Sequence, residues 1–406
     1  MHLNLVFIEI AIPSIINNIE TNYAYYQKFT SDILWNEKRE LTSDRNYVYN
    51  SINHNHNFIL HPVKISSEHS KNILTNLFIK EKCVIITTIN GPTETILKHI
   101  NNNKYDVIIV GDIKTPSIYK KLNCIYLDIE SQKKLFPKLN GLMKCNHYCR
   151  KNLGYLYAIK KGYKIIYETD DDNIPYDNFD HVLNYKNLHM ISQKNNIWIN
   201  IFKYFTNDAH IWPRGYPLKY TKDEAIFKIS NTNSHPSIIN GLVENDPDVD
   251  AIFRLTQQFK NDIMWISGKT ILIDNKNLCV FNTQNTFWTD DQLFMLMLIP
   301  STVSFRYCDI LRGIICGIVL KYTNKYMMYS SPNVVQNRNE HNLMNDFSSE
   351  YEMYINNETI LDYIENNIDI NMTTKEIMIT IYNNLLEHNV IKNDDIKILN
   401  EWLKYF

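Results

Sequence analysis

Three consecutive carboxylates, Asp170, Asp171 and Asp172, follow the apolar run KIIYET in the sequence. If this run is a strand, alternate side chains face the same way, so Asp170 and Asp172 share one face and Asp171 points to the other. Two carboxylates on one face repel each other unless a cation or a proton lies between them. Mn²⁺ or Mg²⁺, with coordination positions left for phosphate oxygens, would suit this pair. A solvated acidic turn is the alternative, but an apolar strand that ends in acid favours a metal site at Asp170 and Asp172.

The elements that position these acids follow an alternating pattern from Lys82 onward. Continuous β-branched and apolar runs predict strands over residues 83–89, 106–112, 123–128 and 164–172. Between them, ETILKHINN and the segment 148–162 have helical spacing, the second with Gly162 as its C-terminal stop. Strands and helices in alternation predict an α/β fold, with a mostly parallel sheet that is covered by helices on both faces.

Parallel strands place their carboxyl ends at one edge of the sheet, where such folds bind ligands. The side chains that we expect there are Thr87, Thr88, Asn90, Asp112 and Asp171, and the family resemblance given next implies that they contact a nucleotide and its phosphates. Arg150 and Lys151 open the helix predicted over 148–162, where backbone N–H groups already favour an anion, and we assign them to the diphosphate. An ordinary basic first turn is the alternative for these two residues.

An Asp-x-Asp pair after a strand of an α/β domain resembles the motif of GT-A glycosyltransferases, in which a metal bridges the carboxylates to the diphosphate of a nucleotide sugar. Longer stretches resemble the STELLO-type glycosyltransferases, a group related to the reversibly glycosylated polypeptides that act as UDP-arabinopyranose mutases. The matching stretches, in chain order, are CVIITTINGPTETI (83–96), VIIVGDIKTP (107–116), RKNLGYLYAIKKG (150–162), the acidic turn (170–172), IWPRGYPL (211–218), GLVENDPDVDAIFRLT (241–256), FNTQNTFW (281–288), PSTVSFRYCDILRG (300–313) and SPNVVQNRNEHNLMNDF (331–347).

This resemblance implies a GT-A-like, Rossmann-like domain that transfers a sugar from a nucleoside diphosphate sugar to a glycan or protein acceptor. UDP is favoured over GDP by the resemblance alone. Two rival functions stay open: a nucleotide-sugar mutase, and a catalytically silent scaffold that keeps the fold as a binding surface. The plant members carry an N-terminal membrane anchor and act in the Golgi with cellulose synthase, whereas residues 1–81 of this chain match nothing in the family.

Two further candidate residues belong to stretches that match the family. Arg214 lies in WPRGYP (212–217), which predicts a rigid turn that presents one guanidinium between aromatic rings suited to a sugar. In the related mutases the arginine of a similar stretch is associated with self-glycosylation, and a packed turn with a surface arginine is the alternative. Asp309 lies between Arg306 and Arg312 and matches an aspartate of the family, so it is a candidate for a catalytic or acceptor contact or for a structural ion pair.

Asp291 is the candidate for the base that would deprotonate an acceptor hydroxyl, because it precedes the apolar segment LFMLMLI, which we expect to be a helix. A capping box formed by Thr289 and Gln292 is the structural alternative for this segment. The alternating acids of DPDVD (246–250) predict either a second cation or acceptor site or a turn that caps the helix after them.

The composition limits the partners. A net charge of -2 argues against nucleic acid as a partner. Seven scattered cysteines indicate thiols in a reducing compartment. No uncharged apolar run reaches the roughly eighteen residues of a membrane span, and no basic region precedes the apolar N-terminus. We therefore expect a cytoplasmic protein, which for a viral source would mean the host cytoplasm or the virion.

The chain divides into three predicted regions. Residues 1–81 have no assigned role, residues 82–325 form the GT-A-like domain, and residues 326–406 form a helical C-terminal region that could pack on the domain or pair two copies as a homo-oligomer. We expect residues 337–341 to close over the site. The chain has no GxxxxGK phosphate loop, which argues against generic phosphoryl transfer.

Overall fold

The computed structural model describes residues 32–33, 58–59, 81–208, 210–257, 263–337 and 342–406. The chain separates into two compact units, residues 1–80 and 81–406. In the first unit, strand β1 (Asp32–Ile33) pairs in parallel with β2 (Phe58–Ile59). The second unit contains all the candidate site residues. Those of 338–341 lie outside the described residues.

An 11-stranded sheet forms the centre of this unit, in the order β5-β4-β3-β6-β12-β10-β13-β11-β8-β9, with β7 paired to β13. The bounds are β3 Lys82–Thr88, β4 Asp106–Gly111, β5 Ile125–Leu127, β6 Ile165–Thr169, β7 Asn173–Pro175, β8 His189–Gln193, β9 Phe227–Asn231, β10 Pro236–Glu244, β11 Thr270–Ile273, β12 Asn285–Trp288 and β13 Tyr326–Gln336.

The four strands predicted from the apolar runs are the four neighbours β5, β4, β3 and β6, and all of their pairings are parallel. The middle residues of β3, β4 and β6 are buried on both faces, as a continuous apolar pattern requires, whereas those of the short β5 are half-buried. Beyond β6 the sheet is mixed, because β12 runs antiparallel to both β6 and β10 while β13 runs parallel to β10. The mostly parallel α/β sheet is therefore confirmed, but four of its strands, β12, β11, β8 and β7, run opposite to β3.

This strand order decides which residues meet at one edge of the sheet. β3, β4, β6, β10 and β13 run in the same direction, so their C-terminal ends lie at the same edge. β12 runs the opposite way, and the residues that lead into it, Thr283 and Gln284, therefore arrive at that edge as well. The acidic turn after β6 thus has neighbours from segments that are more than a hundred residues away in the chain.

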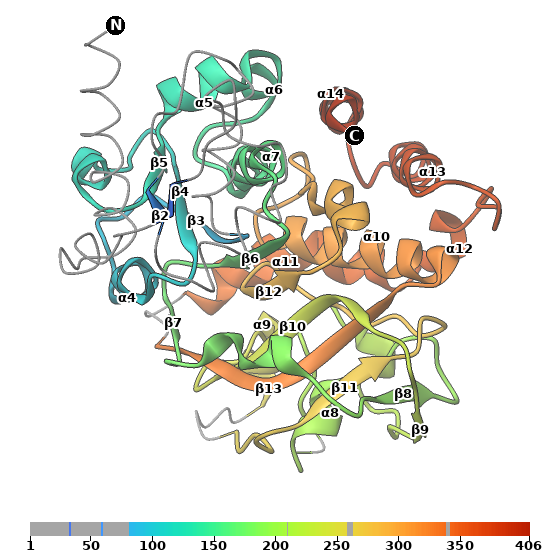
Figure 1. The fold of residues 1–406 in the computed structure, drawn as a ribbon. Coiled ribbons are helices and arrows are strands. Elements are labelled where there is room, and N and C mark those ends of the chain that lie inside the picture. Colours follow the sequence, from blue (N-terminus) through green and yellow to red (C-terminus); the bar gives the residue numbers. More distant parts are fainter. Residues whose placement is uncertain (1–31, 34–57, 60–80, 209, 258–262, 338–341) are drawn as a thin grey trace, which may run out of the picture. The chain divides into compact units, whose positions relative to one another are not determined.

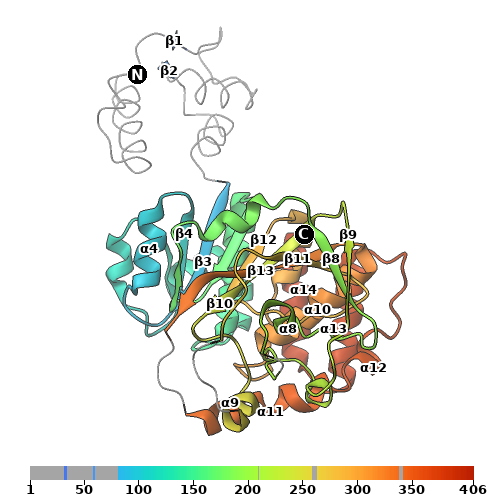
Figure 2. The same cartoon turned by 90° about the horizontal axis from the view of Figure 1, so that it is seen from below.

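The helices of the second unit surround the sheet. Their bounds are α4 Glu94–Asn102, α5 Ile129–Leu135, α6 Pro137–Leu142, α7 Lys151–Lys161, α8 Phe202–Phe205, α9 Ala251–Thr256, α10 Cys308–Thr323, α11 Leu343–Asn357, α12 Leu361–Ile364, α13 Thr374–Glu387 and α14 Asn393–Trp402. Figure 1 shows α10 between the sheet and α13, and Figure 2 shows α9 beside α11. No helix among the described residues is long and apolar enough to cross a membrane.

Helix α7 begins at Lys151, one of the two residues predicted to bind the diphosphate, and packs closely on the sheet. It ends at Gly162, whose φ of +81° is the left-handed conformation that glycine adopts most readily, as predicted. At the contact with β3 and β4 the helix has Gly154, where an added Cβ would lie 2.4 Å from the Val110 side chain and 2.9 Å from that of Ile85. The absence of a side chain at Gly154 therefore lets α7 pack close to β3 and β4.

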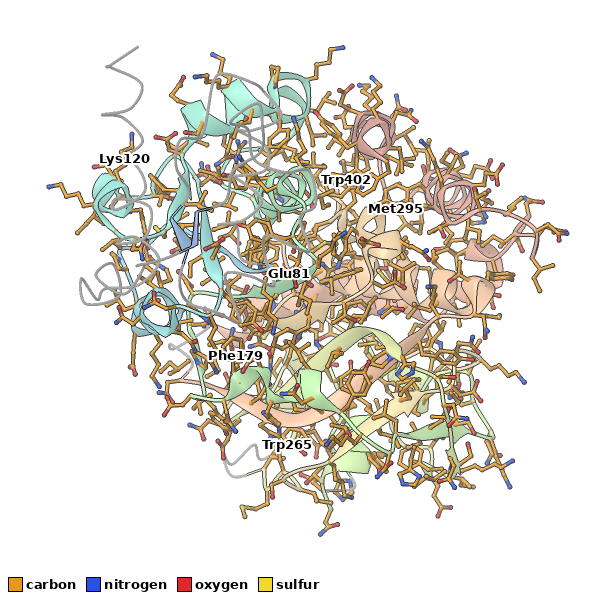
Figure 3. All side chains as sticks on the ribbon, viewed as in Figure 1. Glu81, Lys120, Phe179, Trp265, Met295 and Trp402 are labelled. Carbon is orange, nitrogen blue, oxygen red and sulfur yellow. The ribbon has the colours of Figure 1, made fainter. Side chains whose placement is uncertain are left out.

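The C-terminal region is helical from Leu343 onward, as expected, but β13 (Tyr326–Gln336) belongs to the middle of the sheet. Helix α14 docks on the segment before α10: the Trp402 indole Nε1 donates to the carbonyl oxygen of Met295 over 2.8 Å, and Figure 3 labels both residues on neighbouring segments. Met295 lies in a 3₁₀ helix, η6 (Asp291–Met297), where the sequence predicted an α-helix. All seven cysteines are free thiols, and all but Cys124 and Cys145 are buried.

Candidate functional site

A cavity of about 520 Å³ opens at the edge where β3, β4, β6 and β13 end. This volume is in the range of small-molecule sites. Its lining contains most of the residues predicted from the sequence, which are Thr87, Thr88, Asn90, Asp112, Arg150, Asp170, Asp171, Asp172, Arg214 and Asp309. Its other lining residues include Lys114, His147, Tyr148, Asp248, Thr283, Gln284, Phe305, Arg306 and Gln336.

The first carboxylate of the acidic turn, Asp170, is held from the start of α7. Its Oδ1 accepts a short hydrogen bond from the Tyr148 hydroxyl and lies 3.4 Å from the Lys151 ammonium. The Asp170 side chain is 32% exposed and lines the cavity. Burial raises the pKa of Asp170 to about 6, and the nearby negative charges of Asp172 and Asp171 add to this rise, while the positive charge of Lys151 opposes it.

Lys151 lies beneath the acidic turn and is fully buried, so it does not line the cavity. Its Nζ donates to the Tyr148 hydroxyl and to the Thr169 carbonyl, both over 2.8 Å, and lies 3.4 Å from the Thr283 carbonyl. The Tyr148 oxygen is in turn 2.6 Å from the Thr283 hydroxyl. Lys151 was predicted to bind the diphosphate. Its ammonium instead contacts oxygen atoms of the protein and holds Asp170.

The second carboxylate, Asp171, is bound to the end of β3, and the three acids lie in a turn after β6 (Ile165–Thr169) rather than in the strand predicted over 164–172. Asp171 Oδ2 accepts hydrogen bonds from the Thr88 hydroxyl over 2.5 Å and from the Asn90 amide over 3.1 Å. The Asp171 carbonyl oxygen also accepts from the Thr93 hydroxyl over 2.5 Å. Asp171 therefore joins the acidic turn to the loop after β3, and Thr88 and Asn90 take part in this junction.

The third carboxylate, Asp172, is held by two glutamines in succession, Gln336 of β13 and Gln284, the residue before β12. Gln336 Nε2 donates to Asp172 Oδ2 over 2.8 Å, and Gln284 Nε2 donates to Gln336 Oε1 over 2.6 Å. A carboxylate can only accept, so Gln336 must direct its amide nitrogen to Asp172 and its oxygen to Gln284. Each of the three carboxylates thus has its own partners, from different parts of the chain.

Arg214 lies in the opposite wall of the cavity and is buried rather than presented on the surface. Its guanidinium makes a bidentate contact with Asp309 at 2.9 and 3.1 Å, donates to Asp248 Oδ1 over 2.7 Å and donates to the Arg306 carbonyl oxygen. Burial alone would raise the pKa of Asp248, but the charge and hydrogen bonds of Arg214 outweigh burial and lower it. The structural ion pair is therefore the arrangement observed for Asp309.

The aromatic rings beside Arg214 do not face a ligand, contrary to the expectation for the WPRGYP turn. Trp212 and Tyr216 are buried, and Trp212 packs edge-to-face on Phe253. The Trp212 indole donates to Asp250 Oδ2 over 2.6 Å, and Asp250 Oδ1 accepts from the Phe253 backbone N–H at the start of α9. Asp250 is thus a helix cap, which is the structural alternative predicted for DPDVD.

Arg150 and Asp112 line the cavity with their polar groups already partly occupied. The Arg150 guanidinium is buried and donates to Gln132 Oε1 over 2.8 Å and to the side chain of Asn140. Asp112 Oδ1 accepts from the Ile113 backbone N–H over 2.7 Å at the mouth of the cavity. Thr87 Oγ1 is buried without a hydrogen-bond partner among the described residues.

Asp291 is not brought together with the other candidates. It lies in a separate surface hollow of about 580 Å³, together with Pro236 and Tyr326, the first residues of β10 and β13. That places it at the edge opposite the acidic turn, where it forms an exposed ion pair with Lys164 at 2.9 Å. The cap of the following 3₁₀ helix is Asp290, which accepts from the Gln292 N–H, and not Thr289 as the capping-box alternative proposed.

Sequence reasoning missed Tyr148, Thr283, Gln336 and Phe305 as residues of the cavity. Tyr148 precedes the first residues of α7 by one turn, and this position relative to the helix start was an available signal. Thr283 and Gln336 reach the cavity only because β12 and β13 lie beside β6 in the sheet, which the order of elements along the chain does not predict.

Comparison with known proteins gives a consistent family. The model of the STELLO glycosyltransferases matches residues 306–406. Two Arabidopsis thaliana proteins are similar to this chain: "Probable glycosyltransferase STELLO1", 24% identical over 263 residues, and "Probable glycosyltransferase STELLO2", 23% identical over 306 residues. The matched residues are 58% and 69% of this chain but only 33% and 38% of those two proteins. On these matches, the chain is similar to the STELLO glycosyltransferases, and the family model covers its residues 306–406.

Proposed function

We propose that residues 81–406 form a GT-A-like domain that transfers a sugar from a UDP-sugar to an acceptor, with the diphosphate bound over the acidic turn. One observation carries the proposal: the cavity brings Asp170 and Asp172 together with the ends of β3 and β4, where the nucleotide residues were predicted. The similarity to probable glycosyltransferases supports the reaction class.

A divalent cation at Asp170 and Asp172 is part of this proposal, and the residues fit one. Asp172 raises the pKa of Asp170, so the two carboxylates repel each other as a pair without a cation should. In the described part of the chain, no three His, Cys, Asp or Glu side chains converge into a complete metal-binding set. A pair of carboxylates completed by substrate phosphates is how proteins commonly hold Mg²⁺. When bound, the cation would neutralise the charge that develops on the leaving nucleoside diphosphate.

The surrounding residues then have defined tasks. Tyr148 and Lys151 fix the orientation of Asp170, and Gln336 fixes that of Asp172. Thr88 and Asn90, tied to Asp171, hold the loop after β3 against the acidic turn, where it can contact the nucleotide. Arg214 forms ion pairs with Asp309 and Asp248, which also line the cavity, and we assign it the task of holding these two carboxylates in place.

Thermal unfolding with nucleotides tests the proposal. We expect UDP together with Mn²⁺ to raise the Tm of the wild-type protein, and GDP to raise it less; a ligand at about 100 times its Kd adds about 2.7 kcal/mol of stability. Asp170→Asn and Asp172→Asn should each abolish the part of the shift that depends on Mn²⁺. Asp291→Asn is the matched control, because this acid lies outside the cavity and should leave the shift unchanged. A UDP shift that is identical with and without Mn²⁺ would contradict the cation site.

Product analysis separates transfer from the rival functions. With a panel of UDP-sugars and Mn²⁺, a transferase releases UDP, and it does so faster when an acceptor is present. A mutase instead converts the UDP-sugar to its ring isomer without an acceptor. Failure of every nucleotide and of Mn²⁺ to shift the Tm would favour the silent scaffold.

A further inference from the structure

Phe305 is an apolar ring left exposed at the cavity. Its side chain lines the cavity and the residue is 59% exposed, in contrast to Trp212 and Tyr216, whose rings are buried and do not line the cavity. Single exposed apolar side chains are common, but this ring lines a cavity, where a ligand that covered it would gain the favourable burial of a phenyl ring. Ile89, 49% exposed, is the other large apolar side chain of the lining with such exposure.

The ring is presented by a rigid turn. On one side of it, the Ser304 backbone N–H donates to Glu352 over 2.9 Å and the Ser304 hydroxyl donates to the Ser349 carbonyl over 2.5 Å. On the other side, Arg306 Nε donates to Glu350 over 2.7 Å. Both anchors lie on α11 (Leu343–Asn357), so the position of Phe305 is fixed before any ligand arrives. A ring held in place loses little conformational freedom on binding.

The position of the ring connects it to the acidic turn. Phe305 packs edge-to-face with Tyr148, with ring centroids 5.6 Å apart and an angle of 80°, and more loosely with His147 at 6.4 Å. Tyr148 is the residue whose hydroxyl holds Asp170. Only one side chain therefore separates the exposed ring from the carboxylate that the proposed function assigns to the donor diphosphate.

A pyranose ring matches this surface. It has a face of C–H groups that can lie on an aromatic ring, and hydroxyl groups around its rim that need hydrogen-bond partners. The same cavity is lined by such partners, among them Asn146, Lys114 and Asp112. A lipid chain would need a continuous apolar groove, whereas most of the residues that line this cavity are polar or charged, the apolar ones being Ile89, Val110, Pro247 and Phe305.

We propose that Phe305 is the platform on which the acceptor binds, and that the acceptor is a glycan whose terminal sugar stacks on this ring. The proposal rests on the proposed function, because the donor diphosphate is assigned to the carboxylates of the acidic turn. Phe305 lines the same cavity, is more exposed than Asp170, and is not part of that turn, which leaves it for the second substrate.

Binding of four neutral tetrasaccharides tests this: cellotetraose, xylotetraose, maltotetraose and laminaritetraose, each titrated into the full chain saturated with UDP and Mn²⁺. We expect at least one to bind the wild-type protein, and Phe305→Ala to weaken that binding about tenfold or more, by loss of the stacked ring. Phe305→Tyr keeps the ring and should keep the affinity. Tyr351→Ala removes an exposed ring of α11 that does not line the cavity, and should have no effect.

The UDP affinity of the same samples identifies what fails. If Phe305→Ala binds UDP as wild type does but loses the tetrasaccharide, the platform is supported. If Phe305→Ala instead weakens UDP, the ring serves the nucleobase and the proposal is overturned. It is also overturned if no tetrasaccharide binds, or if Phe305→Ala binds one as tightly as wild type. Tetrasaccharide binding that needs Phe305 in a protein that does not bind UDP would support the platform and reject the transferase.

Discussion

The buried ion pair behind the acidic turn gives a stability prediction of defined size. Glu168 and Arg312 are both fully buried and form a bidentate contact, with Arg312 Nη1 and Nη2 at 2.8 and 2.7 Å from the two carboxylate oxygens. Tyr155 and Trp288 also donate to Glu168. Burial alone would raise the pKa of Glu168, but the charge of Arg312 outweighs burial and lowers it. The pair joins β6, two residues before Asp170, to α10.

Removing one member should destabilise the protein strongly. Glu168→Gln keeps the shape of the side chain but leaves the Arg312 charge buried without a counter-charge, and breaking such a pair typically costs about 3–5 kcal/mol. At about 2 °C per kcal/mol for a domain of this size, the Tm should fall by about 6–10 °C. Arg312→Met should cost a similar amount. The double variant removes both charges, so its loss should be smaller than the sum of the two single losses by about 2 kcal/mol or more.

Urea unfolding and thermal scans of the four proteins would measure this coupling. Asp291→Asn is the control, since it breaks an exposed ion pair with Lys164, and such pairs contribute about 0–1 kcal/mol. The stabilisation should also decrease at acidic pH, because a carboxylate with a lowered pKa in the folded state stabilises above its ordinary pKa and loses this effect as the pH falls. Single variants that lose less than about 1 kcal/mol, or a double variant whose loss equals the sum, would refute the reasoning.

Three further predictions concern other parts of the fold. Gln336→Leu, which removes the donor to Asp172, should weaken Mn²⁺ binding in the presence of UDP by about 10–100-fold in a calorimetric titration, whereas Gln292→Leu on the exposed surface should not. Burial raises the pKa of Asp250 from 3.8 to about 7, so the contribution of this carboxyl to stability falls as the pH rises between these two values. The Tm of Asp250→Asn relative to that of wild type should therefore increase from pH 5 to pH 8. A Tm difference that stays constant over this range would contradict the prediction. Gly154→Ala should cost about 1–3 kcal/mol in urea unfolding, because the added methyl group meets Val110, while Gly141→Ala, where the space is open, should not.

The parallel part of the fold was predictable from the sequence because its signal is local. Each of β3, β4 and β6 is a continuous apolar run that only a strand buried on both faces explains, and each ends in polar residues. The order of strand and helix then requires those ends to share an edge. Strand β6 ends at Thr169, however, so residues 170–172 form a turn and the strand alternation expected for them does not apply.

The roles that the sequence did not predict depend on partners far along the chain. Arg214 resembled a residue free to bind phosphate, but its ion-pair partners Asp248 and Asp309 lie 34 and 95 residues away and occupy its guanidinium. Asp291 has the same local setting as a catalytic acid at a helix start, and only the direction of β12 places it at the opposite edge of the sheet. No local pattern distinguishes the exposed ring of Phe305 from the buried ring of Trp212.

The acidic turn therefore has two levels of organisation. Strand β6 delivers three carboxylates to the edge of the sheet, but their orientations depend on three separate segments: Asp170 on residues 148–151, Asp171 on residues 88–93 and Asp172 on Gln336. Three adjacent negative charges are unfavourable unless each is hydrogen-bonded or paired. Because the partners come from the start of α7 and from the ends of β3 and β13, the site can form only when the sheet is complete from β3 to β13. Substitutions at these partners should then affect ligand binding before they affect the fold, which separates them from the Glu168–Arg312 pair beneath.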